Sequence, residues 1–405
     1  MFSKKEKGFC AYCEPLIEKH GRFSNRIIVQ VTSIVNAIDT FFPARSAGFY
    51  RFEKEFINIL IKFLSKIRVV KIVPITNREE VQGRTLVIVD EAVKRGHNVN
   101  LVKIFNRHFN MFQINIKNES SFFHVLPSLD SQENNTIDFA DKYLFKLFLK
   151  SNNLPHVSGK VFRNEDKALR YGDEIGYPLV VKPQFGSLSR HTSINIKNKE
   201  GLKEAIGIAK ITTNEFIVER HIEGKNYRAV VIGNKMAACA LREPANVTGD
   251  GFNTIEQLIE IKNSSPLRGG YQQKNYTLKK IAITPRLEES LKQKKYTLKK
   301  IPFKGEKIYL DDKIILSGGA DIHDMTTMIH KANIELFENL SLLLKTSMVG
   351  FDFITSDISE PHYNSDFAII EANSAPYIDM HHFPVSGAPR NIAEKIIDIL
   401  ESKNI

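Results

Sequence analysis

The stretch Ile369-Ile370-Glu371-Ala372-Asn373-Ser374-Ala375-Pro376, read with Gly350-Phe351-Asp352-Phe353 upstream, carries the strongest structural signal in the chain. Both segments begin as short apolar runs with β-branched or aromatic residues, which is typical of buried strands. Side chains alternate along a strand, so Glu371 and Asn373 are expected on one face, and Asp352 joins them if the two strands pair. Two carboxylates and an amide oxygen suit Mg²⁺, which keeps waters and substrate phosphates as its other ligands. This stretch alone leaves open a second interpretation, a buried strand with a capping Asn373 and an ion-paired Glu371.

The composition indicates a globular protein with an anionic partner. The 405 residues are 42% apolar and 25% charged, and the chain is long enough for two or three domains. The formal net charge of +11 suits nucleotide phosphates, an acidic peptide or nucleic acid. Nucleic acid is disfavoured, because the basic residues are spread along the chain and no surface motif combines them with aromatic residues.

No secretory or membrane segment is expected. The basic start at residues 4–7 leads into no apolar core of a signal peptide, and four basic residues interrupt the most apolar stretch, residues 56–75. Cys10, Cys13 and Cys239 are too few for a disulfide framework and favour a reducing cytoplasm. The Cys10-Ala-Tyr-Cys13 motif leaves a zinc site, a redox pair and no chemistry at all as open alternatives.

Periodicity divides the chain into three regions. Residues 1–68 are expected to form a mostly helical N-terminal segment, and residues 69–136 a small α/β domain, since strand, helix and strand alternate there. A second α/β unit makes residues 137–405 the largest domain. The octapeptide Lys274–Ile281 recurs almost unchanged as Lys294–Ile301, and we interpret the second copy as a local duplication, because two copies do not make a solenoid.

Three more strand ends carry polar residues. Lys182 ends an apolar strand and precedes a loop of small residues, which can fold over phosphates or form a plain hairpin with a basic tip. Glu219 ends another apolar strand, where it can receive the exocyclic amine of adenine or form an ion pair at the strand edge. Arg228 leads into a strand at Ala229–Gly233, and its planar guanidinium suits a carboxylate or an acyl phosphate.

The order of these polar residues resembles the ATP-grasp superfamily of carboxylate–amine ligases, over roughly Asp141 to Leu400. The segments 242–251, 254–259 and 263–268 resemble those shared by cyanophycin synthetase and the glutathione-synthetase half of bifunctional glutathione enzymes. Met380-His381, Phe383-Pro384 and residues 387–393 look closer to cyanophycin synthetase, as does the upstream unit 86–116. The resemblance implies an α/β (α+β) ATP-grasp fold, with two α+β subdomains that enclose a nucleotide cleft and a clamping subdomain at about 160–225.

The resemblance also implies a role for each matching residue. Lys142 and Lys182 would contact ATP phosphates, and Glu219 and the backbone near Ile222 would hold adenine. The metal ligands would bind two Mg²⁺ ions, for which Mn²⁺ can substitute. Arg228 and Arg242, with Lys182, would act on the substrate carboxylate and its acyl phosphate, which an amine then attacks to give an amide or peptide bond. The full set of implied site residues is Arg228, Arg242 and Lys182 for catalysis; Lys142, Lys182, Ser187, Ser189, Glu219, Ile222 and Asn226 for the nucleotide; and Asp352, Glu371 and Asn373 for the metal.

The chain departs from the family pattern at several positions. The loop after Lys182 contains Ser187, Leu188, Ser189 and His191 where glycine is usual, and Asn226 replaces the acidic residue expected at the ribose. The segment 310–319 lacks a polar residue near Ile315 and has a shortened glycine turn. Asp379 replaces a basic residue, and Tyr377 replaces a glycine. The metal and phosphate residues are unaffected, but the identity of the amino-acid substrates is left open.

We therefore expect an ATP-dependent, cyanophycin-synthetase-like ligase of small amino-acid or peptide substrates, cytoplasmic and without nucleic-acid or membrane partners. A glutathione-synthetase-like ligase and a degenerate ATP-binding regulatory module are the alternatives. The sequence shows no counterpart of the Mur-ligase-like half of cyanophycin synthetase after Leu400, so addition of both aspartate and arginine to a polymer is not expected. The resemblance is compatible with a homo-oligomer, although no individual residue in the sequence indicates one.

Overall fold

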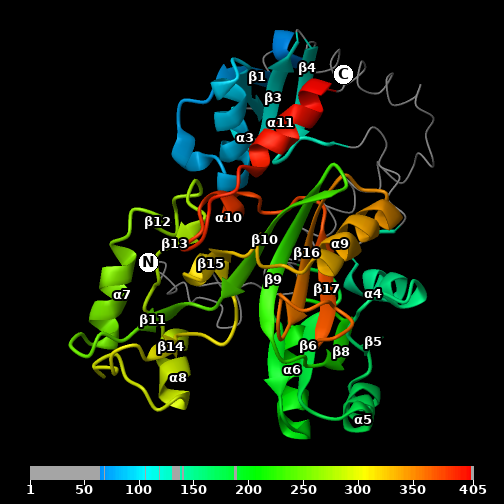
Figure 1. Ribbon diagram of the computed structural model, residues 1–405, viewed down its shortest axis with the longest axis vertical. Helices are drawn as coiled ribbons and strands as arrows, with labels where there is room; N and C mark the ends of the chain where they lie inside the picture. Colours follow the sequence, from blue (N-terminus) through cyan, green and yellow to red (C-terminus); the bar gives the residue numbers. More distant parts are fainter. Residues whose placement is uncertain are drawn as a thin grey trace, which may run out of the picture.

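The computed structural model describes residues 64–67, 69–104, 106–117, 119–129, 137–138, 141–186 and 189–402. The predicted helical segment 1–68 lies almost wholly outside these residues, as do Cys10, Cys13 and Ser187. The described elements form the predicted mixed α/β architecture, with several antiparallel sheets (Figure 1). Nowhere in these ranges does a helix combine the length and the apolar character that a membrane crossing requires.

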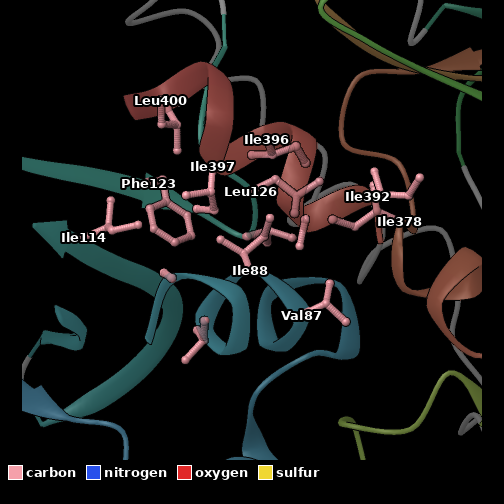
Figure 2. Close-up of a cluster of buried hydrophobic side chains, with 14 of the residues drawn as sticks. Val87, Ile88, Ile114, Phe123, Leu126, Ile378, Ile392, Ile396, Ile397 and Leu400 are labelled. Atoms are coloured by element: carbon pink, nitrogen blue, oxygen red, sulfur yellow. The ribbon is translucent and has the colours of Figure 1, made fainter. Parts of the chain in front are cut away.

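The first unit is built on a four-stranded antiparallel sheet in the order β1-β2-β3-β4. Its elements are β1 (Val70–Pro74), the 3₁₀ turn η1 (Arg78–Glu80), α3 (Gly83–Lys94), β2 (Asn98–Ile104), β3 (Arg107–Ile116) and β4 (Glu119–His124). The last described helix, α11 (Ile392–Ser402), packs on α3. Figure 2 shows Ile396 and Ile397 of α11 close to Ile88 of α3 and to Leu126, all within one buried cluster. The end of the described chain therefore completes the core of its first unit.

The second sheet covers the range predicted to clamp a nucleotide. Helix α4 (Lys142–Ser151) precedes it, and its strands β5 (Gly159–Phe162), β6 (Leu179–Pro183), β7 (Ser193–Ile196) and β8 (Phe216–Arg220) pair antiparallel in the order β5-β8-β6-β7. Helices α5 (Glu165–Ile175) and α6 (Lys199–Ala209) contribute to its apolar core. Each of these two helices begins at an asparagine whose side chain accepts a backbone N–H, Asn164 for α5 and Asn198 for α6. Gly176 ends α5 at a positive φ of 79°, a conformation that favours glycine.

The third sheet is the centre of the molecule. Its strands are β9 (Lys225–Ile232), β10 (Lys235–Glu243), β15 (Asp321–Asp324), β16 (Met348–Thr355) and β17 (Phe367–Asn373), and they pair antiparallel in the order β15-β10-β9-β16-β17. Side chains of β9 alternate between two cores: Ala229 and Val231 join the cluster that includes α9 (Lys331–Leu344), whereas Val230 and Ile232 join the cluster of α3 and α11. The continuous apolar sequence of β9 thus matches a strand that is buried on both faces.

Residues 244–319 form an insertion between β10 and β15 that has a hydrophobic core of its own. It contains β11 (Asn246–Thr248), α7 (Ile255–Asn263), β12 (Arg268–Gly269), β13 (Leu278–Lys279), α8 (Pro285–Gln293), β14 (Lys307–Tyr309) and the 3₁₀ turn η2 (Leu316–Gly318). The first copy of the repeated octapeptide contains β13, whereas the second copy, after α8, contains neither helix nor strand. The short helix α10 (Asp379–His382) follows β17 and leads towards the first unit (Figure 1).

Candidate active site

The three predicted metal ligands lie together on the paired strands β16 and β17. Asp352 is directly opposite Glu371, and a β-bulge follows Asp352. Asn373 lies two residues further along β17, and its Nδ2 donates a hydrogen bond to Glu371 Oε1 at 3.3 Å. The structure therefore brings these side chains together, as the alternation of strand side chains predicts.

Two arginines hold the Asp352 carboxylate. Arg228 is opposite Asp352 on the neighbouring strand, and its Nε donates to Asp352 Oδ1. Arg242 reaches across from β10: its Nη2 lies 2.9 Å from Asp352 Oδ2, and its Nε donates to Asn226 Oδ1 at 2.9 Å. Burial alone would raise the pKa of Asp352, but Arg228 and Arg242 outweigh burial and lower this pKa to about 2. Asp352 is therefore an ionised carboxylate at neutral pH.

The strand that carries Arg228 begins earlier than the sequence predicts. Apolar residues place its start at Ala229, whereas β9 starts at Lys225 because it pairs with a strand on each side. Asn226 and Arg228 are consequently strand residues on one face. This placement aligns Asn226 with Arg242 and Arg228 with Asp352.

Glu371 lies beside a second carboxylate. Burial and, next, the negative charge of Asp352 raise the pKa of Glu371, and the charge of Lys142 offsets only part of this effect. Across the described ranges no group of three or more His, Cys, Asp or Glu side chains is suited to a metal ion, and the role of Asn373 as a third ligand stays a prediction. Two carboxylates and one amide supply hard oxygen donors, and a divalent cation would relieve the repulsion between the two carboxylates. This donor set fits Mg²⁺.

Glu219 of β8 forms buried ion pairs with lysines from two other elements. Lys182 Nζ, from β6, lies 2.6 Å from Glu219 Oε1, and Lys146 Nζ, from α4, pairs with Oε2. Lys146 also donates to the carbonyl oxygen of Val157 at 2.9 Å. Of the two alternatives that the sequence leaves open for Glu219, the structure contains the ion pair, and the adenine contact stays a prediction.

Sequence reasoning missed Lys146. Helix α4 begins after Asp141, whose carboxylate accepts hydrogen bonds from the backbone N–H groups of Tyr143 at 2.8 Å and Leu144 at 3.1 Å. Lys142 and Lys146 are four residues apart and therefore lie on the same side of this helix. Lys142 Nζ donates to the carbonyl oxygen of Gly186, in the loop after β6. The spacing of the two lysines was the signal that could have identified the second one.

We expect Glu219→Gln to weaken the dependence of stability on acid pH. Burial would raise the pKa of Glu219, but Lys146 and Lys182 lower it from 4.5 to about 2. A carboxylate of this kind adds stability above its unfolded pKa and loses that contribution as the pH falls through its folded pKa. The free energy of unfolding, measured by urea titration, should therefore fall more steeply for the wild type than for the variant between pH 4.5 and about 2.

The matched control for this prediction is Glu215→Gln, which removes the half-buried partner of the exposed Arg163. Because solvent screens such a pair, its loss should change the acid dependence much less. Equal slopes for the wild type and Glu219→Gln would contradict the prediction.

The range that holds these lysines also matches known proteins. Residues 141–241 match the family model described as the ATP-binding domain of the carbamoyl-phosphate synthase L chain. The fold is similar to that of a bifunctional glutathione synthetase from Pasteurella multocida, with a TM-score of 0.59 and 24% identity over 81% of this chain and 45% of that one. The chain contains an ATP-grasp domain. The predicted fold is thereby confirmed.

Curated relatives of this ATP-grasp chain fall into two groups. A cyanophycin synthetase of Geminocystis herdmanii is 35% identical over 267 residues, which are 65% of this chain and 30% of the relative. A glutathione biosynthesis bifunctional protein of Clostridium perfringens is 32% identical over 332 residues, which are 80% of this chain and 41% of the relative. The chain thus spans less than half the length of either relative.

The remaining predicted nucleotide contacts of the ATP-grasp domain occupy loops or strand ends. Ser189 lies in the loop after β6 with a positive φ of 54°, and Ile222 lies between β8 and β9. Asn226 accepts a hydrogen bond from Arg242, so its side chain is already part of the arginine cluster. Ser187 lies outside the described residues. The roles of these four residues towards a nucleotide stay predictions.

Helix α10 adds two buried side chains to which the sequence assigned no role. His381 is 2% exposed, and neither of its ring nitrogens has a hydrogen-bond partner among the residues that the structure describes. Burial, followed by the positive charge of Arg228, lowers the pKa of His381 to about 3, so the imidazole is neutral at physiological pH. Asp379, two residues earlier, is also buried. Both depend on contacts between distant segments, which leave no local sequence pattern.

Proposed function

We propose that this chain is an ATP-dependent ligase that joins a carboxylate to an amine through an acyl phosphate. The observation that carries the proposal is one cluster on the central sheet of an ATP-grasp domain. In it the buried Asp352 contacts Arg228 and Arg242 and lies beside the half-buried Glu371 and Asn373. Such a cluster combines ligands for a divalent cation with fixed positive charge, which are the requirements for activating a carboxylate with ATP.

Lysines and the second sheet supply the nucleotide site in this proposal. Lys142 and Lys182 contact the phosphates beneath the loop that includes Ser187 and Ser189, and Asn226 lies towards the ribose. Glu219 and the backbone of Ile222 hold adenine. Lys146 can keep Glu219 paired when Lys182 turns towards a phosphate, because the two lysines bind different oxygens of this carboxylate. The double ion pair thus lets Lys182 move without leaving a buried carboxylate unpaired.

Asp352, Glu371 and Asn373 would hold two Mg²⁺ ions, and Mn²⁺ can substitute because it accepts the same oxygen donors. When bound, these ions offset the negative charge of the ATP phosphates. Arg228 and Arg242 fix the orientation of Asp352 through its two oxygens.

Arg228 and Arg242 also face the substrate carboxylate and its acyl phosphate. Arg228 Nη1 is buried and has no hydrogen-bond partner among the described residues, so it is a donor available to a substrate oxygen. In the second half of the reaction a C–N bond forms, the carbonyl C–O bond to phosphate breaks, phosphate leaves with the electron pair, and the amine nitrogen loses a proton. Negative charge develops on the carbonyl oxygen, and a fixed guanidinium stabilises it.

The substrates in this proposal are small amino acids or peptides. The two curated relatives are named for cyanophycin and glutathione synthesis, and we favour a cyanophycin-synthetase-like peptide ligase, with a glutathione-synthetase-like ligase as the alternative. A reducing cytoplasm suits a chain with three cysteines. A homo-oligomer is compatible with this activity.

Phosphate release tests the proposal. Purified protein with ATP and Mg²⁺ should release phosphate only when both a carboxylate and an amine are supplied, first from pooled amino acids and short acidic peptides and then from single compounds. Hydroxylamine in place of the amine should trap the acyl phosphate as a hydroxamate, and mass spectrometry should find a product equal to the two substrates less one water. ATP binding without amine-dependent release across the panel would instead favour a degenerate regulatory module.

A further inference from the structure

The buried carboxylate of Asp379 lies where three segments distant in sequence meet. Its Oδ2 accepts a hydrogen bond from Thr277 Oγ1, in the insertion, at 2.6 Å. Gly83, the first residue of α3, is so close that a Cβ there would lie 2.6 Å from the same oxygen. The backbone N–H of Gly83 in turn donates to the carbonyl oxygen of Lys274 at 3.0 Å. Helix α10, the insertion and the first unit therefore all contribute to the surroundings of Asp379.

Two buried oxygens at this junction lack a donor. Within the described part of the chain, neither Asp379 Oδ1 nor Asn275 Oδ1 has a hydrogen-bond partner. The two residues are neighbours, because the carboxyl carbon of Asp379 and the main-chain oxygen of Asn275 lie 3.3 and 3.5 Å from the Cβ position of Gly83. A buried oxygen without a donor is unfavourable, and more so when it is charged. The junction can therefore accept hydrogen bonds from a donor group at these two oxygens.

The cations nearest to Asp379 donate to other groups. Arg84 donates to the carbonyl oxygen of Ala375 at 2.6 Å and to Gln82 Oε1 at 3.0 Å, and Lys279 donates to the carbonyl oxygen of Gln273. Their charges act on Asp379 through space. Burial outweighs these charges and raises the pKa of Asp379, so a bound cation would stabilise the ionised carboxylate beside the unpaired amide oxygen of Asn275.

The junction adjoins the proposed active site through α10 and the turn before it. Ala375, which accepts the hydrogen bond from Arg84, follows the proposed metal ligand Asn373 by two residues. His381, on the same short helix as Asp379, lies within the field of Arg228. The turn at Ala375 and helix α10 therefore connect the proposed active site to Asp379 along the chain.

We propose that Asp379, together with Asn275, binds a positively charged nitrogen of the amine substrate. The inference rests on the proposed ligase function and narrows its substrate class. The attacking nitrogen has to be neutral to form the C–N bond, so the nitrogen held by Asp379 is a second one, which stays charged throughout. The substrate class is therefore an amine with an additional ammonium or guanidinium group, such as a basic amino acid or a diamine.

Matched pairs of amines test this inference. Each pair has a cationic member and a neutral analogue of similar length: lysine and norleucine, arginine and citrulline, and putrescine and butylamine. The measured quantity is the ratio of kcat/KM for the cationic member to that for the neutral one, from amine-dependent phosphate release. In the wild type we expect this ratio to exceed about tenfold in at least one pair, the effect of a hydrogen bond to a charged group. In Asp379→Asn the ratio should fall by about tenfold to a hundredfold, mainly through KM.

Two further variants and a direct measurement complete the design. Asp366→Asn removes the same charge from an exposed position and should leave the ratio unchanged. Asn275→Ala removes the second acceptor without a change in charge and should lower the ratio by about threefold to tenfold; it decides the question if Asp379→Asn fails to fold. Calorimetry should show tighter binding of the preferred cationic amine to the wild type than to Asp379→Asn.

Two outcomes would overturn the inference. Equal use of cationic and neutral amines in every pair would refute it and leave the ligase function intact. Absence of phosphate release with any amine, cationic or neutral, would refute the ligase function and this inference with it.

Discussion

Glu371→Gln should lose nearly all phosphate release and yet be at least as stable as the wild type. Loss of a carboxylate ligand removes several kcal/mol of charge stabilisation by the metal ions, and about 1.4 kcal/mol corresponds to a factor of ten, so we expect at least about a hundredfold fall in rate. The free energy of unfolding should instead rise in the variant. Burial and the charge of Asp352 raise the pKa of Glu371, so its ionised form is unfavourable in the folded protein. A raised carboxyl pKa contributes stability at low pH that is lost as the pH rises through the folded value, and glutamine avoids this loss.

The two readouts are steady-state phosphate release and thermal unfolding at about pH 5 and pH 8. The stability advantage of Glu371→Gln should be larger at the higher pH, and ATP with Mg²⁺ should raise the Tm of the wild type more than that of the variant. Glu335→Gln is the matched control, since Glu335 is exposed on α9 and lies 3.7 Å from Lys331. Equal phosphate release by the wild type and Glu371→Gln would rule out the metal role.

The features that sequence could predict are those whose information is local. Alternation along one strand places Glu371 and Asn373 on the same face whatever surrounds them. Helix ends follow the same logic: Asp141 caps the start of α4, and Gly176 ends α5 in a conformation that other residues rarely adopt. Apolar runs bounded by such signals gave the strands that carry Lys182 and Glu219.

Contacts between distant segments left no such pattern. Lys146 and Glu219 are 73 residues apart, and Arg95 and Asp398, whose ion pair joins the first unit to α11, are 303 residues apart. The start of β9 was missed for the same reason. Pairing with β10 and β16 determines where this strand begins, whereas its own first residues are polar. The repeated octapeptide shows the limit directly: the first copy forms β13 beside β12, while nearly the same residues in the second copy form neither helix nor strand. Tertiary surroundings decide the conformation there.

Arg228→Met should destabilise the protein strongly and shift its acid sensitivity to higher pH. Removal of one partner from a buried ion pair typically lowers the free energy of unfolding by about 3–5 kcal/mol, and Asp352 would keep only Arg242 while still beside Glu371. In the wild type, Asp352 contributes stability that is lost as the pH falls through its folded pKa of about 2. Without Arg228 this pKa rises, so the loss should set in at a higher pH. Urea unfolding at about pH 7 and pH 4 measures both effects.

Lys235→Met is the matched control, because it removes the same charge from a neighbouring strand. Lys235 pairs with Glu338 at 2.8 Å, but its side chain is 80% exposed, so the variant should lose less than about 1 kcal/mol. A clear difference in the free energy of unfolding between the two variants would show that a buried ion pair contributes more to stability than an exposed one. The Arg228–Asp352 pair would then stabilise the central sheet at the candidate site. If Arg228→Met and Lys235→Met unfolded at the same urea concentration, the prediction would be contradicted. Arg242 alone would then be sufficient to stabilise Asp352, and the role of Arg228 would be limited to the substrate.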